Sequence, residues 1–216
     1  ALTFVFVYIL LHLSYIINGN GTPFVDSERK IVLNEGFADM ERNQYNVPII
    51  PSTISSFIQK LPGIEGYSLY NGQSTNIFVN NSLLISTVGF VNGSYWTINQ
   101  FDFTEGRAFT AEECESRTPY AVISQSVAEK YFKKDSALGQ KLEIQGNTYK
   151  IIGVVKDFSS YFDGMDAEVW VPYPFNKFIP DGSQIYNITL LWPQSTPVAD
   201  MKKKTAHAVK TYFLEQ

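Results

Sequence analysis

The sequence has one cysteine and two histidines, and this shortage excludes several kinds of site. Cys114 has no second cysteine to pair with, so neither an intrachain disulfide nor a cysteine-based zinc cluster can form. His12 and His207 lie far apart and lack the spacing of metal ligands or of a nucleophile–base pair. The patterns Gly-x-Ser-x-Gly and Gly-x-x-x-x-Gly-Lys are also missing. The sequence therefore predicts a protein that is not an enzyme and holds no metal and no cofactor, so any ATP would be bound by another chain.

Basic residues are too few and too scattered for a nucleic-acid binder. The formal net charge is −4, whereas nucleic-acid binding requires a basic stripe. The one dense basic run, Lys202–Lys204, is interpreted as the solvated face of a helix. The acidic pairs Glu112/Glu113 and Asp163/Asp166 are interpreted as a helix start and a solvated loop rather than as catalytic carboxylates.

Apolar and aromatic residues, in contrast, are plentiful. The 216 residues are 44% hydrophobic and 15% aromatic, with 16 Phe and 13 Tyr. This composition indicates a folded chain rich in strands, and the length suits one domain or two small lobes.

The first 17 residues form a long apolar run. Ala1–Ile17 contains no formally charged side chain, and its length reaches the lower limit of a membrane span, about 17–25 residues. Residues 18–27 are polar and contain no Lys or Arg, which suits the non-cytoplasmic side of a membrane. We therefore expect the run to be the end of a transmembrane helix. A signal peptide is disfavoured because no basic segment or cleavage pattern accompanies the run, and a buried strand or helix is the remaining alternative.

The two ends of the chain carry similar patterns. Near the N-terminus, residues 29–33 predict a strand and residues 39–51 a loop or an irregular second strand. Apolar side chains then recur with helical spacing over residues 54–61. Near the C-terminus, alternation over residues 184–192 predicts a strand, and Thr196–Pro197 predicts the start of a helix.

Between these ends the sequence alternates short strands, turns and short helices. Strands are predicted over residues 64–70, 76–79, 83–91, 120–124, 141–145, 148–155 and 168–172. Turns are predicted at Asn71–Gly72, at Asn80–Asn81 and, with type II′ geometry, at Gly146–Asn147. Short helices are predicted over residues 94–100, after Thr110 and after Ser124.

This order of elements predicts an α+β fold in two lobes. The chain ends, residues 28–71 and 164–216, would form one βαβ lobe. Residues 72–163 would form a second lobe of strands and short helices inserted into it. Residues 156–166 are predicted to be a mobile loop.

An aromatic cluster overlaps the end of this second lobe. Its members are Phe158, Tyr161, Phe162, Trp170, Tyr173 and Phe175. Because aromatic side chains dominate core burial, the first interpretation is a core where the two lobes join. The alternative is a partly exposed surface for a substrate or partner, formed by Phe158, Tyr161, Phe162, Trp170 and Tyr173.

Four stretches occur in an order that is typical of one family. The first runs from Gly89 through Tyr95-Trp to Phe101-Asp-Phe-Thr-Glu-Gly-Arg-Ala-Phe109. The others are Ala121-Val-Ile-Ser-Gln-Ser-Val-Ala-Glu-Lys-Tyr-Phe132, Leu138-Gly-Gln-Lys-Leu142 and Tyr149-Lys-Ile-Ile-Gly-Val-Val-Lys-Asp-Phe158. In this order, after an apolar run, they resemble the MacB-like periplasmic core domain of ABC transporter permeases of the MacB/FtsX/Lol type. The resemblance covers residues 30–216.

The resemblance implies a location and a set of partners. The domain would lie on the periplasmic side of the bacterial inner (cytoplasmic) membrane, with a porter-like βαβ lobe and an inserted lobe. Its partners would be a cytoplasmic ABC ATPase, a second permease copy and a periplasmic adaptor or substrate protein. Residues 42–51 depart from the family pattern and no long partner-binding hairpin is recognisable, which leaves the adaptor open.

The sequence is therefore consistent with three hypotheses about function. The first is a non-enzymatic permease domain that couples cytoplasmic ATP hydrolysis to substrate export or to movement of an outer partner. The second is a membrane-anchored extracytoplasmic ligand-binding or sensing module with its ligand between the lobes. The third, a hydrolase of unrecognised type, has little support because the chain has so few histidines.

Overall fold

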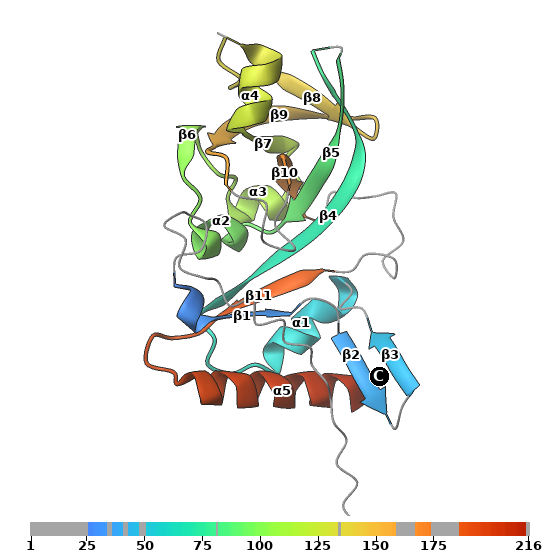
Figure 1. Ribbon diagram of the computed structural model, residues 1–216, viewed down its shortest axis with the longest axis vertical. Helices are drawn as coiled ribbons and strands as arrows, with labels where there is room; N and C mark the ends of the chain where they lie inside the picture. Colours follow the sequence, from blue (N-terminus) through green and yellow to red (C-terminus); the bar gives the residue numbers. More distant parts are fainter. Residues whose placement is uncertain are drawn as a thin grey trace, which may run out of the picture. The chain divides into compact units, whose positions relative to one another are not determined.

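The computed structural model (Figure 1) describes residues 26–33, 36–40, 43–47, 51–80, 82–133, 135–158, 167–173 and 186–214. The chain divides into two compact units, unit 1 with Asp26–Tyr67 and Phe178–Gln216, and unit 2 with Ser68–Lys177. Strands and helices occur in both, so the predicted α+β class is confirmed. Strand β10 (Val169–Pro172), which we expected in the lobe of the chain ends, belongs to unit 2.

The predicted transmembrane run Ala1–Ile17 lies outside the described residues. Among the residues that are described, no helix has both the length and the apolar character that a membrane crossing requires.

Unit 1 pairs strands from the two ends of the sequence. Strand β1 (Lys30–Leu33), which follows the short 3-10 helix η1 (Ser27–Arg29), runs antiparallel to β11 (Asn187–Leu191). Helix α1 (Pro51–Gln59) contacts α5 (Val198–Leu214). Alternate residues of each strand and one face of each helix are buried, including Ile31, Leu33, Ile54, Phe57, Ile188, Leu190, Met201 and Val209. The helical spacing predicted for residues 54–61 and the alternation predicted for residues 184–192 are therefore confirmed in their described residues, whereas Val198 at the start of α5 is exposed.

Residues 36–47 differ from the prediction. Strands β2 (Gly36–Met40) and β3 (Asn43–Val47) form a regular antiparallel pair, so the interpretation of residues 39–51 as a loop or irregular strand was wrong. Two such strands satisfy each other's backbone N–H and C=O groups. Strand pairing therefore does not need the alternating apolar pattern that this polar stretch lacks.

In unit 2, six of the described strands pair in a closed ring. Their order is β4 (Gly66–Val79), β5 (Ser82–Val91), β10, β7 (Tyr120–Ser124), β9 (Asn147–Val155) and β8 (Lys141–Ile144), and β8 pairs with β4 again. Strand β6 (Phe103–Gly106) pairs with β9 outside the ring. The pairs β10–β5 and β7–β9 are parallel, whereas the other ring pairs are antiparallel.

Strands β4 and β5 form the hairpin predicted around Asn80–Asn81, but it is longer than predicted because β4 is one continuous strand. The predicted turn at Asn71–Gly72 was wrong, because β4 runs through both residues and Gly72 lies opposite Gly89. A Cβ at Gly72 would lie 2.6 Å from the Tyr70 hydroxyl oxygen, so a side chain there would have to displace the end of the Tyr70 side chain. Asn80 has the positive φ expected of the hairpin turn, and the end of β4 bears exposed Phe78.

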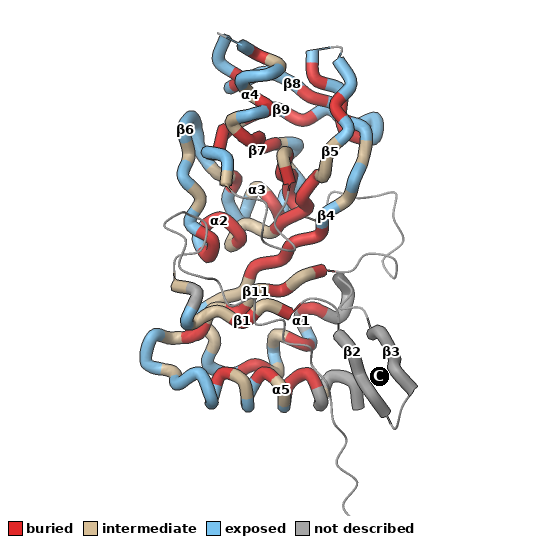
Figure 2. Tube along the Cα trace, viewed as in Figure 1, coloured by how far each residue is buried: buried red, intermediate tan, exposed pale blue. Residues whose placement is uncertain are grey.

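The turn between β8 and β9 is displaced by one residue from the prediction. Ile144 pairs with Asn147, so the turn residues are Gln145 and Gly146 rather than Gly146 and Asn147. Both have positive φ, 51° and 77°, which is the type I′ pattern and not the predicted type II′. Buried and exposed residues alternate along β8, as Figure 2 shows.

Three helices complete unit 2 where the sequence predicted them. They are α2 (Ser94–Asn99), α3 (Ala111–Glu115) and α4 (Gln125–Phe132). Thr110 caps α3, and the Ser124 side chain accepts from Val127 N at the start of α4.

Candidate functional site

Unit 2 has two buried clusters, and the aromatic one contains part of the predicted site. Its members are Tyr70, Val91, Tyr95, Trp96, Phe109, Cys114, Val122, Val155, Ala167 and Trp170, with Phe101, Phe103, Ala108, Ile152 and Phe158 packed against them. The ring centroids of Trp96 and Trp170 are 6.1 Å apart, and those of Phe101 and Phe158 are 5.4 Å apart. Such separations suit edge-to-face and tilted aromatic pairs.

The predicted surface residues occupy different environments. Trp170 is 0% exposed, whereas Phe158 and Tyr173 are half-buried. Tyr161, Phe162 and Phe175 lie outside the described residues. Among the described members of the predicted surface, exposed area is therefore found on Phe158 and Tyr173, and the rest of that surface stays a prediction.

Trp170 depends on a glycine on the neighbouring strand. Gly89 lies opposite Trp170 in the β5–β10 pair, and a Cβ there would be 2.7 Å from Trp170 Cδ1 and 2.9 Å from Tyr70 Cε2. Two large rings thus share the space that a side chain at Gly89 would fill. Sequence reasoning predicted the short helix that carries Tyr95 and Trp96 but could not join it to Trp170.

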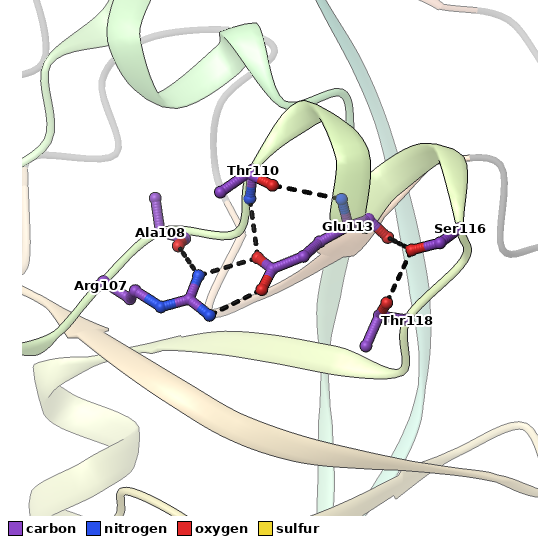
Figure 3. Close-up of polar contacts among 6 residues, drawn as sticks. All are labelled: Arg107, Ala108, Thr110, Glu113, Ser116 and Thr118. Atoms are coloured by element: carbon purple, nitrogen blue, oxygen red, sulfur yellow. Dashed lines mark hydrogen bonds and ion pairs between the residues drawn. The ribbon is translucent and has the colours of Figure 1, made fainter.

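The run around Arg107 is a closed polar network, shown in Figure 3. Arg107 donates from Nη1 to Glu113 Oε2 at 2.8 Å and from Nη2 to Glu113 Oε1 at 2.6 Å. Glu113 Oε2 also accepts from Thr110 N, and the Thr110 hydroxyl accepts from Glu113 N, which completes a capping box. Hydrogen bonding from Arg107 lowers the pKa of Glu113. The predicted helix start is confirmed, and this carboxylate has a structural role.

Burial also shifts the pKa values of Cys114 and Lys30 strongly. Burial raises the pKa of the Cys114 thiol to about 12, so the thiol is inert near neutral pH. Burial lowers the pKa of Lys30 in unit 1 to about 8, and Lys30 Nζ has no hydrogen-bond partner within the described part of the chain. Neither group contacts a nucleophile or base with which it could form a catalytic pair.

A pocket of about 370 Å³ lies within unit 2. It is lined by residues of β5, the start of α4, the segment after β9 and the start of β10: Ser86, Thr87, Ser124, Ser126, Asp157, Phe158, Ala167, Glu168 and Trp170. Two carboxylates, several hydroxyls and two aromatic rings thus converge, and no Lys, Arg or His is among the described lining residues. Its volume falls in the range of small-molecule sites, about 300–1,000 Å³. We call this feature the acidic pocket.

The carboxylates of the acidic pocket are held by hydroxyl and backbone donors. Asp157 Oδ1 accepts from Ser126 N at 3.1 Å, and Asp157 Oδ2 accepts from the Ser126 hydroxyl. Glu168 Oε2 accepts from the Ser86 hydroxyl, while the Glu168 backbone is fixed by Ser124 N and Thr87 O. Both acids are therefore positioned without a neutralising side chain.

Sequence reasoning found Phe158 and Trp170 in this pocket but missed Asp157 and Glu168. Asp157 follows the end of β9, and Glu168 immediately precedes β10. An acid next to each of two buried strands was the available signal. Within the described residues, no group of three His, Cys, Asp or Glu side chains could hold a metal ion.

Comparison with known proteins identifies the fold and the family. The sequence profile of the MacB-like periplasmic core domain matches residues 13–206. The chain belongs to this family. The MacB-like resemblance of the four ordered stretches is thereby confirmed, and the family's members include periplasmic domains of ABC transporter permeases.

Two curated relatives are named as permeases. The "Uncharacterized ABC transporter permease YknZ" of Bacillus subtilis (strain 168) is 27% identical over 155 residues, which are 70% of this chain and 39% of that protein. The "Macrolide export ATP-binding/permease protein MacB" of Escherichia coli (strain K12) is 25% identical over 118 residues, 54% of this chain and 18% of that protein. The chain thus spans under two fifths of the length of these relatives.

Two solved structures share the fold. The periplasmic region of MacB from Actinobacillus actinomycetemcomitans superposes with a TM-score of 0.72 at 17% identity, covering 92% of this chain and 88% of that one. The extracellular domain of the noncanonic transporter YknZ from Gram-positive bacteria gives 0.61 at 21% identity, covering 77% and 85%.

Proposed function

We propose that this chain is the extracytoplasmic domain of an ABC transporter permease subunit and transmits motion that is driven by ATP hydrolysis in the cytoplasm. That motion would export a substrate or move an outer partner. The family match over residues 13–206 carries this proposal, together with superposition on a MacB periplasmic region over 92% of the chain. The domain itself carries no chemistry in this proposal.

The proposal includes a membrane location and several partners. The domain would lie on the periplasmic side of the bacterial inner membrane, held by an N-terminal helix that ends in Ala1–Ile17. A cytoplasmic ABC ATPase, a second permease copy and a periplasmic adaptor or substrate protein would be its partners. The names of the relatives, ABC transporter permeases, support the ATPase and the membrane.

Two described surfaces could contact such partners. One comprises the exposed parts of Phe158 and Tyr173. The other is the end of the β4–β5 hairpin, where Phe78 lies opposite Leu83 and both are about half exposed, with Ile85 nearby at 68%. Contiguous exposed apolar groups often mark interaction sites.

The first test is purification of the native full-length protein in detergent. We expect an ABC ATPase to co-purify, and ATP hydrolysis to disappear when the nucleotide site of that subunit is mutated. A protein with a single membrane span that arrives alone would overturn the proposal.

A second experiment tests the coupling itself. A cysteine introduced at exposed Lys203 would carry a spin label in each of two permease copies, and the buried native Cys114 should remain unlabelled. We expect the distance between labels to change with ATP in the complete transporter. The matched control is the transporter with the mutated nucleotide site, which should show no change. An equal distance in all nucleotide states would contradict transmitted motion.

The second candidate function, a ligand-binding or sensing module, is favoured by one observation, the acidic pocket. The sequence-based hypothesis placed the ligand between the lobes, whereas this pocket lies within unit 2. A lone single-span protein with a saturable small ligand would favour this function over the first.

A further inference from the structure

We propose that the acidic pocket binds a small organic cation, namely a primary ammonium group carried on an aromatic or apolar body. Such binding would be a property of unit 2 alone and does not rest on the proposed transport role.

The charge of the pocket selects a cation. Asp157 and Glu168 both line it, and no Lys, Arg or His of the described part of the chain does so. Lys156 precedes Asp157 in the sequence but is exposed and does not line the pocket. Glu113 provides a contrast within the same unit, because Arg107 engages both of its carboxylate oxygens. The pocket therefore lacks the internal cation that neutralises Glu113, and an ammonium ligand would supply it.

The two carboxylates differ in how many further hydrogen bonds they can accept. Asp157 already accepts from the backbone and the hydroxyl of Ser126 at the start of α4, where the helix dipole also favours its charge. Glu168 is engaged through Oε2 by one hydroxyl, that of Ser86. We therefore assign Glu168 as the principal partner of the ammonium group and Asp157 as the secondary one.

An anionic ligand does not fit the same pocket. The start of a helix can bind anions through free backbone N–H groups. At α4, Ser126 N already donates to Asp157 and Val127 N to the Ser124 hydroxyl. An anion would meet two carboxylates and find these donors occupied.

The apolar walls select the body of the ligand. Phe158 is half-buried and Trp170 is fully buried, and their ring centroids are 6.2 Å apart. Aromatic rings attract cations and pack against apolar groups. The Trp170 Nε1–H is buried and has no acceptor in the described part of the chain.

The test uses the 216-residue chain in detergent, with its three tryptophans labelled as 5-fluorotryptophan and observed by ¹⁹F NMR. Trp170→Phe assigns the Trp170 signal. The probe is phenethylammonium, compared with its neutral analogue 2-phenylethanol and the anion phenylacetate. We expect phenethylammonium to shift the Trp170 signal saturably. The alcohol should bind about tenfold more weakly or worse, because one charge-assisted hydrogen bond is worth at least that factor.

Three variants locate the site. Glu168→Gln should weaken phenethylammonium binding by about tenfold or more, and Asp157→Asn should weaken it less. The matched control is Glu143→Gln, an exposed acid on β8 that does not line the pocket, and it should leave binding unchanged. Circular dichroism confirms that each variant is folded.

Several outcomes would overturn the proposal. They are equal binding of the ammonium and the alcohol, a shift that never saturates, or a shift confined to Trp96 or Trp192. If Glu168→Gln does not fold, the comparison of ligands on the unaltered chain still decides. None of these outcomes bears on co-purification with an ATPase, so failure here and failure of the proposed function are distinguishable.

Discussion

The two buried clusters of unit 2 are built from different side chains. The cluster that includes Ile77, Ile123, Ile151 and Val169 is predominantly aliphatic and draws on all six strands of the described ring. The other is predominantly aromatic and contains tryptophan N–H groups without acceptors among the described residues. Consecutive residues of one strand separate them, since Ile123 belongs to the first and Val122 to the second.

This difference in side chains suggests different roles for the two clusters, one in stability and the other in binding. Branched aliphatic side chains pack densely and carry no polar atom that requires a partner. Aromatic side chains bury more area but bring N–H and O–H groups, and the acidic pocket borders Phe158 and Trp170 of this cluster. The aliphatic cluster should therefore determine the free energy of unfolding, whereas the aromatic cluster should tolerate changes that alter its polar groups.

The largest expected loss in the free energy of unfolding comes from a substitution in the aliphatic cluster. Ile123 is 0% exposed, so Ile123→Ala should lower the free energy of unfolding by about 2–5 kcal/mol through lost burial and a cavity. Trp170→Phe, also at a fully buried site, should cost only about 1–2 kcal/mol because it removes an unsatisfied N–H together with part of the ring. Urea unfolding followed by circular dichroism measures both. A larger loss for Trp170→Phe would contradict the comparison.

A smaller loss of stability is expected when a methyl group is added beside Trp170. Gly89→Ala would place its Cβ 2.7 Å from Trp170 Cδ1, and overpacking of this kind costs about 1–3 kcal/mol. Gly72→Ala is the matched control because Gly72 lies opposite Gly89, is exposed and contacts mainly the end of the Tyr70 side chain. Thermal unfolding should rank Gly89→Ala as the more damaging. The reverse order would show that the aromatic cluster can shift at no cost.

The cap of α3 should contribute about 1 kcal/mol to the free energy of unfolding. Glu113→Gln weakens the contact with Arg107 and the bond from Thr110 N, and loss of a capping interaction typically costs this much. Because the folded-state pKa of Glu113 is lowered, its contribution is present above the ordinary value near 4.5 and is lost as the pH falls through the lowered pKa. Unfolding measured from pH 7 to pH 3 should show the variant and the unaltered chain converge at low pH. Glu115→Gln, an exposed acid on the same helix, is the control and should differ little at any pH.

The last and smallest expected effect is the reactivity of the Cys114 thiol in the native chain. A thiol reagent measures this reactivity without any substitution. With the pKa raised to about 12, roughly one thiol in 10⁴ is ionised at pH 8, and the side chain is buried. A disulfide reagent should react slowly with the native chain and rapidly after denaturation in urea. Rapid native labelling would show that the aromatic cluster opens far more easily than its packing indicates.

Local signals predicted an element well where its apolar residues and its capping residue are adjacent in the sequence. Tyr120–Ser124 was predicted with its observed bounds because a short apolar run precedes a capping serine. Asn71–Gly72 was misread as a turn, since its turn chemistry is local whereas its pairing with β5 is tertiary. At Gln145–Gly146 the turn was found but shifted by one residue, because glycine fits more than one position of such turns.

Closure of the ring and the acidic pocket could not be predicted in the same way. The closing pair places Val79 opposite Leu142, and no local pattern specifies a partner so distant in the sequence. The pocket draws two or three residues from each of four separate segments, and only its aromatic members stood out in the sequence. Asp157 and Glu168 look like ordinary surface acids until the strands beside them are assembled.

The ring also affects how copies of this domain can meet. Each of its six strands, all within the described chain, has neighbours on both sides over at least part of its length. Exposed sheet edges are templates on which another chain can add a strand and begin to aggregate. Strand β6, which pairs with β9, is four residues long and ends at Gly106. At high local concentration in a crowded compartment, this part of unit 2 should therefore resist fibril formation, and any self-association through the ring would have to use side chains rather than backbone pairing.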